Sequence, residues 1–144
     1  MFLVDTNVLL YAADKNSEAH AACRAQLETW RRSASPWFLT WGICYEFLRV
    51  STHPRVFRRP WNGASAWKFI AAALASPAVT LLVPTHRHPA VLRQTLEELS
   101  GLAGNRMHDL HTAVLMREHG VSRIVTRDAD FRLFPFLTVI DPLG

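Results

Sequence analysis

The chain opens with Met1-Phe2-Leu3-Val4-Asp5-Thr6-Asn7, a short apolar run followed by an acidic residue and polar residues. The apolar run over residues 1–4 predicts a short buried strand that ends at Asp5. Asp5, Thr6 and Asn7 carry side-chain oxygens that can cap a helix, so a helix is predicted to begin at Val8 and to reach Ala13.

Short apolar runs alternate with longer amphipathic segments along the remaining sequence. Further helices are predicted over residues 17–32, with Ser17 as the cap, and over 42–50, 65–75, 89–102 and 105–118. Further strands are predicted over 37–40, 79–83, 123–126 and 137–140. This alternation predicts the α/β class, as a single three-layer α/β/α sandwich with a short parallel sheet. Because no linker, repeat or low-complexity tract divides the chain, we expect residues 1–144 to form one domain.

The composition excludes several classes of protein. With 49% hydrophobic and 19% charged residues, the chain resembles neither a disordered protein nor a coiled coil. The apolar stretch 69–75 is far shorter than the ~20 residues that a membrane span needs. No basic and apolar leader precedes Asp5, so we expect a cytoplasmic protein that begins at Met1 and has no membrane partner. Cys23 and Cys44 are expected to be buried thiols, because two isolated cysteines form no disulfide framework or zinc motif.

The charge balance favours an anionic partner. Lys and Arg number 16 against 12 Asp and Glu, a net charge of +4, and all but Lys15 and Lys68 of the basic residues are arginine. The planar arginine side chain matches phosphate oxygens and so favours nucleic acid, although a GC-rich genome also enriches arginine codons. The six glycines form no phosphate-binding loop, so ATP and dinucleotide cofactors are not expected.

Acidic residues follow the predicted strands, where α/β proteins build their sites. Asp5 and Asp128 come after strands, Asp109 lies near a helix start, and Glu46 lies on the helix after the second strand. Carboxylates that meet at one sheet edge repel one another unless a hard cation such as Mg²⁺ or Mn²⁺ neutralises them. Alternatively, each of the three aspartates is an ordinary helix cap. The remaining helix carboxylates have polar neighbours and are expected on solvent faces: Glu18, Glu28, Glu97, Glu98 and Glu118.

Four segments that carry these acids together resemble the motifs of the PIN-domain ribonucleases, in the same order and with the expected spacing. They are Phe2-Leu3-Val4-Asp5-Thr6-Asn7-Val8-Leu9-Leu10-Tyr11-Ala12, Glu46-Phe47-Leu48-Arg49-Val50, His108-Asp109-Leu110-His111-Thr112-Ala113 and Val125-Thr126-Arg127-Asp128-Ala129-Asp130-Phe131. The short chain and the stretch 47–57 look most like the VapC-type toxins of bacterial toxin–antitoxin pairs.

The resemblance implies a metal-dependent endoribonuclease and a role for each acid. Asp5, Asp109 and Asp128 would bind one or two Mg²⁺ or Mn²⁺ ions, and Glu46 would orient the attacking water or hold a second ion. The metal would activate water for hydrolysis of an RNA phosphodiester, so no nucleophilic side chain is required. Four further residues would hydrogen-bond the carboxylates or the scissile phosphate, or assist the cluster: Thr6, Asn7, Thr126 and Asp130.

The resemblance also implies three kinds of partner: an RNA substrate, a second copy of the chain in a homodimer, and an antitoxin whose C-terminal segment covers the acidic site and inserts an arginine. An arginine-rich segment could follow RNA phosphates: Arg49, Arg55, Arg58 and Arg59. Its aromatic residues Phe57, Trp61 and Trp67 could stack a base, anchor the antitoxin or belong to the core. His108 and His111 contact a substrate phosphate when protonated, bias the site towards a softer metal, or simply face solvent.

Three other functions fit parts of this pattern. A receiver-like domain would need paired acids after the first strand and a lysine after the last, and neither is present. A catalytically silent PIN-like domain would bind RNA or a protein partner only. A metal-dependent phosphatase would act on small phosphate esters. Hydrolysis of RNA that requires Mn²⁺ and is lost in Asp5→Asn would separate the nuclease from the silent domain.

Overall fold

One parallel sheet of five strands organises the fold in the computed structural model, which describes all residues from Met1 to Gly144. The strands lie in the order β3-β2-β1-β4-β5, so β1 is central. Each has three residues: β1 (Phe2–Val4), β2 (Trp37–Leu39), β3 (Val79–Leu81), β4 (Arg123–Val125) and β5 (Thr138–Ile140). The predicted parallel sheet is therefore confirmed, although every strand is shorter than predicted.

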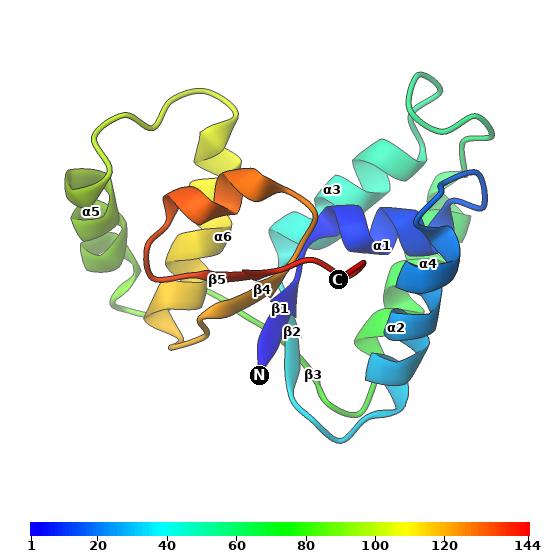
Figure 1. Cartoon of the computed structure of the whole chain (residues 1–144), viewed down its shortest axis with the longest axis horizontal. Coiled ribbons are helices and arrows are strands. Elements are labelled where there is room, and N and C mark those ends of the chain that lie inside the picture. The colour runs from blue at the N-terminus through cyan, green and yellow to red at the C-terminus, as the bar shows by residue number, and fades with distance from the viewer.

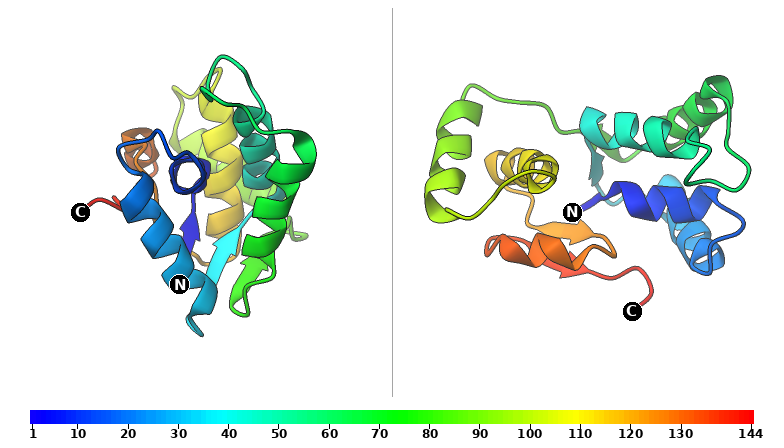
Figure 2. Two further views of the ribbon diagram at one scale, coloured as in Figure 1. Left: turned by 90° about the vertical axis from the view of Figure 1, so that its right-hand side faces the viewer. Right: turned by 90° about the horizontal axis from the view of Figure 1, so that it is seen from above.

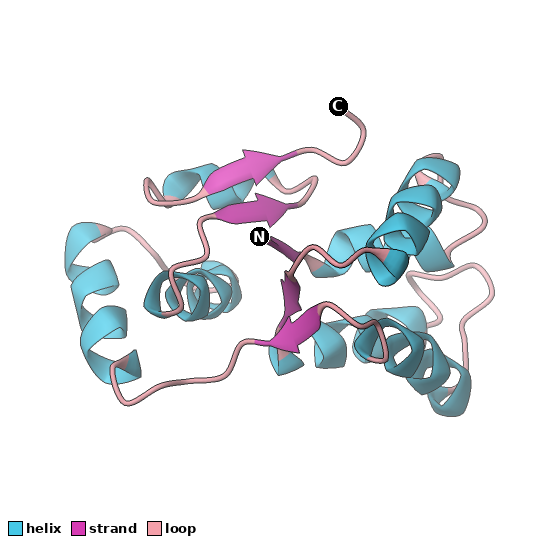
Figure 3. Cartoon of the chain, turned by 90° about the horizontal axis from the view of Figure 1, so that it is seen from below, coloured by secondary structure: helices cyan, strands magenta, loops and turns pink.

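Six α-helices and one 3₁₀ helix cover this sheet (Figure 1). They are α1 (Thr6–Ala13), α2 (His20–Arg32), α3 (Trp41–Ser51), α4 (Gly63–Leu74), α5 (His88–Glu98), α6 (Arg106–Glu118) and η1 (Ala129–Leu133). Helices α2 and α4 lie on one side of the strands and α6 lies on the other, with α5 packed outside α6 (Figure 2). Figure 3 shows the strands between these helices, so the predicted three-layer sandwich is confirmed. No helix of the structure combines the length and apolarity that a bilayer crossing demands.

Local hydrogen bonds explain where the helices begin. The Thr40 side chain accepts a hydrogen bond from Ile43 N (3.0 Å) at the start of α3, and Asn62 accepts one from Ser65 N (2.8 Å) at the start of α4. The predicted cap at Ser17 is wrong. Its hydroxyl accepts from Ala19 N (3.1 Å) inside a turn, so α2 begins only at His20.

The helix predicted over residues 89–102 also ends earlier than expected. Helix α5 stops at Glu98, because Leu99 adopts φ −124° and ψ 69°, which is outside the helical region. The apolar residues that follow, including Leu102, still pack against the core from a loop. Apolar periodicity alone therefore does not mark the end of this helix.

The core lies around β1 and β2, and it accounts for much of the aromatic content. Leu3, Val4 and Trp37 are fully buried. Cys23 and Cys44 are free and buried, as predicted. Burying an aliphatic side chain such as Leu3 or Val4 is worth roughly 1.5–3 kcal/mol, so these strands contribute substantially to stability.

The sheet order also places the functional edge. From β1 the chain builds outward to β2 and β3 on one side, and it later adds β4 and β5 on the other. In such sheets the preferred ligand site is the crevice beyond the carboxyl ends of the two strands between which the direction of strand addition changes. Here those strands are β1 and β4, and Asp5 N donates to Val125 O (3.0 Å) where they end.

Candidate active site

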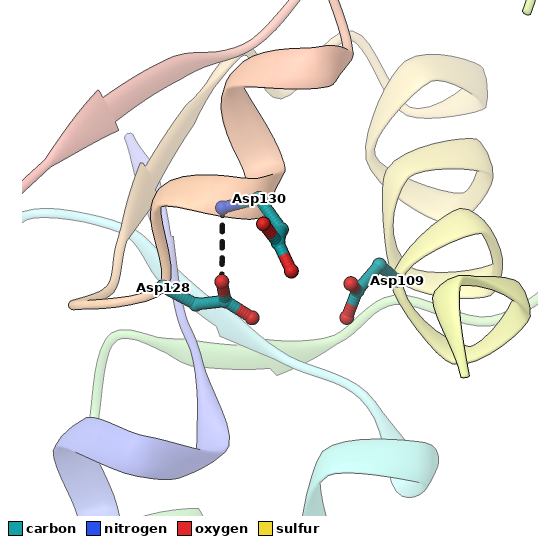
Figure 4. Close-up of side chains that lie close together, drawn as sticks. All are labelled: Asp109, Asp128 and Asp130. Atoms are coloured by element: carbon teal, nitrogen blue, oxygen red, sulfur yellow. Dashed lines mark hydrogen bonds between the residues drawn. The ribbon is translucent and has the colours of Figure 1, made fainter. Parts of the chain in front are cut away.

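Three aspartates meet beyond the carboxyl end of β4. One carboxylate oxygen from each of Asp109, Asp128 and Asp130 lies within 4.8 Å of the others. Asp109 comes from the first turn of α6, and the other two come from the start of η1. Figure 4 shows the side chains of Asp128 and Asp130 directed toward Asp109 across a short gap. Elements more than a dozen residues apart in sequence thus supply one carboxylate cluster.

Hydrogen bonds fix the η1 side of this cluster. The Asp128 carboxylate accepts from Asp130 N (2.9 Å), which caps η1. The backbone N–H of Asp128 in turn donates to Thr126 Oγ1 (3.0 Å). Behind them, Phe131 is buried and anchors η1 to the core. Asp128 therefore acts as a helix cap and also lies in the cluster, so the two interpretations of this residue are compatible.

Asp5 lies beside the cluster at the end of β1 and is held more tightly than any other acid of the site. Its carboxylate accepts hydrogen bonds from Thr6 N (2.8 Å), Thr126 Oγ1 (2.8 Å) and Asn7 Nδ2 (3.3 Å). Thr126 is completely buried and joins Asp5 to Asp128 N, so the ends of β1 and β4 share one network. Asp5 also caps α1, and this position at a strand end leaves its side chain little freedom.

A cleft of about 730 Å³ contains all four of the predicted acids: Asp5, Glu46, Asp109 and Asp128. Glu46 enters it from α3 and is bound by Arg49 of the same helix, at 2.6 Å from Nη2 and 3.1 Å from Nε. Glu46 is thus already paired with a basic side chain, whereas Asp5, Asp109 and Asp128 form no ion pair. Asp130 was expected only to assist, yet its carboxylate joins the tight group in which Asp5 is not found.

The electrostatics of the cleft favour a cation. Burial raises the pKa of Asp109 to about 6, and the neighbouring charges of Asp128, Asp5 and Asp130 contribute. Burial likewise raises the pKa of Asp5, against the hydrogen bonds from Thr126 and Thr6, which lower it. Ionising all these carboxyls together costs free energy that a bound cation would recover. An all-oxygen donor set suits Mg²⁺ or Mn²⁺, so the residues present fit such an ion.

The other predicted residues fall into two groups. Asn7 and Thr126 hydrogen-bond the Asp5 carboxylate through their side chains, whereas Thr6 does so only through its backbone N–H. Arg55, Arg58 and Arg59 are exposed on the loop between α3 and α4. Arg49 lies in the cleft instead, paired with Glu46.

The aromatic residues of this loop belong mostly to the core. Phe57 is buried, and its ring meets that of Trp61 edge-on at 6.4 Å. Trp61 also packs edge-on against Phe47 and Phe69. The suggestion that Phe57 stacks a base is therefore wrong, whereas Trp67 is 47% exposed and stays available for a partner.

The sequence analysis missed one buried acid. Glu118 was expected on a solvent face, but it is 4% exposed, so this prediction is wrong. Its carboxylate accepts from Thr85 Oγ1 (2.8 Å) and Thr85 N (3.1 Å), and it lies 2.6 Å from His88 Nδ1. The signal was present in the helix periodicity, because Glu118 lies on the same face of α6 as the apolar residues Val114 and Leu115.

Sheet order, layers and carboxylate cluster together define an α/β protein with an acidic site at the carboxyl edge of a parallel sheet. Comparison with known proteins identifies the family. The PIN domain family model matches residues 2–137, and the chain belongs to this family. It is 36% identical to Ribonuclease VapC37 of Mycobacterium tuberculosis, over 93% of this chain and 92% of that one. It is 34% identical to the VapC ribonuclease Mb2897 of Mycobacterium bovis, over 99% and 96%.

Solved structures share the fold at lower sequence identity. VapBC2 from Rickettsia felis, solved with a DNA fragment from its promoter, aligns with a TM-score of 0.67 at 16% identity and 96% coverage of both chains. FitAcB from Neisseria gonorrhoeae aligns with a TM-score of 0.63 at 16% identity and 99% coverage of both. These likenesses support the fold described above.

Proposed function

We propose that the chain acts as one PIN domain that hydrolyses RNA phosphodiester bonds with Mg²⁺ or Mn²⁺, as the toxin of a cytoplasmic toxin–antitoxin pair. The observation that carries this proposal is the meeting of three carboxylates within 4.8 Å at the sheet edge, with Asp5 beside them. The full-length similarity to proteins named VapC ribonucleases supports the choice of RNA as substrate.

Each acid of the cleft would have a role that follows from its position and its hydrogen bonds. Asp109, Asp128 and Asp130 would hold the ion, and Asp5 would complete its surroundings from the rigid end of β1. A bound Mg²⁺ or Mn²⁺ supplies an activated water and offsets the charge that develops on the leaving oxygen. Glu46 would orient the water, and its hydrogen bonds to Arg49 keep the carboxylate in the cleft.

The network behind Asp5 would keep this arrangement in place during the reaction. Thr126 donates to Asp5 and accepts from Asp128 N and Asn7 Nδ2 (3.0 Å). Such supporting hydrogen bonds restrict the orientation of metal-binding carboxylates. Because Thr126 is fully buried, the network is shielded from competing water.

The direct test is cleavage of labelled RNA by the purified chain. We expect cleavage with Mn²⁺ and none in EDTA, and we expect Asp128→Asn to lose at least about 100-fold in rate, because removing a charged metal ligand weakens both binding and activation of water. Asp141→Asn is the matched control. Asp141 also follows a strand, but its carboxylate accepts from Leu143 N (2.9 Å) in a local turn and does not line the cleft. The Asp141→Asn variant should therefore cleave RNA at the wild-type rate.

The same assay distinguishes the other functions. RNA binding without cleavage at any divalent-ion concentration would favour a silent RNA-binding domain and contradict the proposal. Hydrolysis of p-nitrophenyl phosphate without RNA cleavage would indicate a phosphatase. Equal activity of Asp128→Asn and wild type would place the chemistry outside the carboxylate cluster.

We further propose that an antitoxin segment covers the acidic cleft and that the chain forms a homodimer. The antitoxin partner is supported by structural relatives described as VapBC and FitAB assemblies, whereas the homodimer follows from the family resemblance alone. The test is co-expression with the product of the adjacent gene, followed by size-exclusion chromatography with light scattering. A stable complex whose RNA cleavage is suppressed is the expected result, and a monomer that stays active in the presence of that product would contradict it.

A further inference from the structure

A second polar cluster adjoins the cleft without belonging to the carboxylate site. It consists of Glu118 near the end of α6, His88 at the start of α5, and His111 two turns before Glu118 on α6. Residues 111 and 118 are seven positions apart, so they share a face of the helix. His88 reaches this face from the neighbouring helix and lies between them.

Glu118 fixes the orientation of His88. The Glu118 side chain is fully buried, and its Oε1 lies 2.6 Å from His88 Nδ1. Burial by itself raises the pKa of Glu118, but the hydrogen bonds from His88 and Thr85 outweigh that effect and hold the pKa below its usual value. Since Glu118 is therefore an acceptor carboxylate near neutral pH, Nδ1 of His88 carries the donated proton.

His88 in turn packs against His111. The two rings meet edge to face at 83°, with their centroids 6.1 Å apart. On its other side the His111 ring lies over Gly42 at the start of α3, where a Cβ atom would come 3.5 Å from Nδ1. His111 is thus held between two helices while it lines the cleft with Asp109 and Asp5.

The His111 side chain has unused hydrogen-bonding capacity, as do those of His108 and Asn105 in the same cleft, but only the His111 ring is packed against both His88 and Gly42. Arg49 is bound to Glu46, and Asn7 is bound to Asp5 and Thr126. Two other histidines are also engaged: His88 with Glu118 and His119 with Val83 O. His111 forms no hydrogen bond within the chain. An acidic cleft needs such a donor, because a phosphate approaching the carboxylates is repelled except where an ion or an N–H receives it.

From this geometry we infer that His111 donates a hydrogen bond to an RNA phosphate in the cleft, and that Glu118 and His88 are positioning residues that hold its ring there. The inference rests on the proposed ribonuclease function and adds a substrate-binding residue to it. His111 touches the substrate, whereas Glu118 and His88 act only through His111.

The first test compares steady-state cleavage of one labelled RNA with Mn²⁺ by wild type and His111→Ala. Loss of one hydrogen bond to substrate should raise KM about fivefold to tenfold and change kcat less than about twofold. Mn²⁺ affinity measured by calorimetry should stay at the wild-type value, because His111 is not among the clustered ligands. An unchanged KM would overturn the inference. Absence of cleavage or Mn²⁺ binding by the wild type would instead contradict the proposed function itself.

The second test asks whether His88 acts through His111. His88→Asn keeps an N–H donor for Glu118 but removes the ring that packs on His111. We expect its KM to rise about threefold, and we expect the double variant His88→Asn/His111→Ala to be no worse than His111→Ala alone. Additive effects would overturn the positioning role.

Glu98→Gln is the matched control for both tests. Glu98 also joins α5 to α6, through Arg117 at 2.7 Å, but it does not touch His88 or the cleft. Its KM should equal that of the wild type. Thermal melting of every variant is measured alongside, and a KM rise shared by Glu98→Gln would show that loosening of α5, not the His88 ring, is responsible, which overturns the positioning role.

Discussion

At the scale of single residues, Asp5 illustrates how one side chain serves structure and site together. It caps α1 through Thr6 N and accepts from Thr126 across 121 positions of sequence. Cap and ligand are usually treated as competing explanations for an aspartate after a strand. Here the strand end provides both, because the carboxylate has lone pairs left after the cap is made.

The pKa of Asp109 gives a prediction at this scale. Because this pKa is about 6, above the ordinary aspartate value, the folded state keeps a proton that the unfolded state releases between about pH 4 and 6. Without metal, stability therefore falls as the pH rises through this window. A metal competes with the same proton, so Mn²⁺ affinity measured by calorimetry should fall about tenfold between pH 7 and 5.

Asp109→Asn supplies the comparison for that prediction. Asparagine removes the titrating group, so the variant should bind Mn²⁺ more weakly at pH 7 and should lose most of the pH dependence. Circular dichroism at pH 5 checks that the fold is retained. Equal wild-type affinity at both pH values would show that Asp109 is not a ligand.

At the scale of elements, the sequence predicted the acids that lie beside a strand or helix boundary. It missed the contacts between segments that are far apart in the chain. Asp5, Asp109 and Asp128 were identified because each lies next to a recognisable strand or helix start. The helix periodicity could have indicated that Glu118 is buried, but its donors, Thr85 and His88, come from a segment about 30 residues earlier that no local pattern connects to it. The close approach of Asp130 to Asp109 likewise depends on how η1 packs, which periodicity does not report.

The buried Glu118 gives the prediction for the α5–α6 pair. Glu118→Gln replaces one acceptor oxygen by an NH₂ group, which faces a donor from Thr85 or His88 and leaves it unpaired. We expect a loss of about 1–3 kcal/mol in the free energy of unfolding at pH 7, measured by urea denaturation. Glu98→Gln, on the exposed side of the same helix pair, should leave the free energy of unfolding close to the wild-type value.

The pH dependence of this loss follows from the direction of the shift. Because the pKa of Glu118 is lowered in the folded state, its stabilisation is present above the unfolded value of about 4.3 and is lost as the pH falls through the folded value. The gap between wild type and Glu118→Gln should therefore narrow at and below about pH 4. A gap that widens in acid would contradict the charged state assigned to Glu118.

At the scale of the whole molecule, the net charge of +4 and the acidic cleft have opposite signs. The exposed Arg55, Arg58 and Arg59 lie on the loop beyond α3, the helix that carries Glu46. This arrangement suits a polyanion such as RNA. The loop arginines would attract it, and a cation bound by the carboxylates would neutralise the phosphate that enters the cleft.

We therefore expect the triple substitution of these loop arginines by glutamine to weaken RNA binding and to lower the steepness of its salt dependence. Loss of three phosphate contacts should reduce the slope of log affinity against log salt by about 2 for a single strand. The matched control replaces three exposed arginines away from the loop, Arg24, Arg32 and Arg123, and its slope should stay near that of the wild type. Equal slopes for both triple variants would show that the loop does not contact RNA.

The central place of β1 has a consequence for synthesis. Among the five strands, the middle strand β1 is translated first, whereas its neighbour β4 is translated fourth. The cluster needs Asp128 and Asp130, so a nascent chain has no complete set of acids until the segment after β4 has been translated. A chain cut short after β4 would lack both of these aspartates, so we expect it to cleave no RNA even though it still carries Asp5, Glu46 and Asp109.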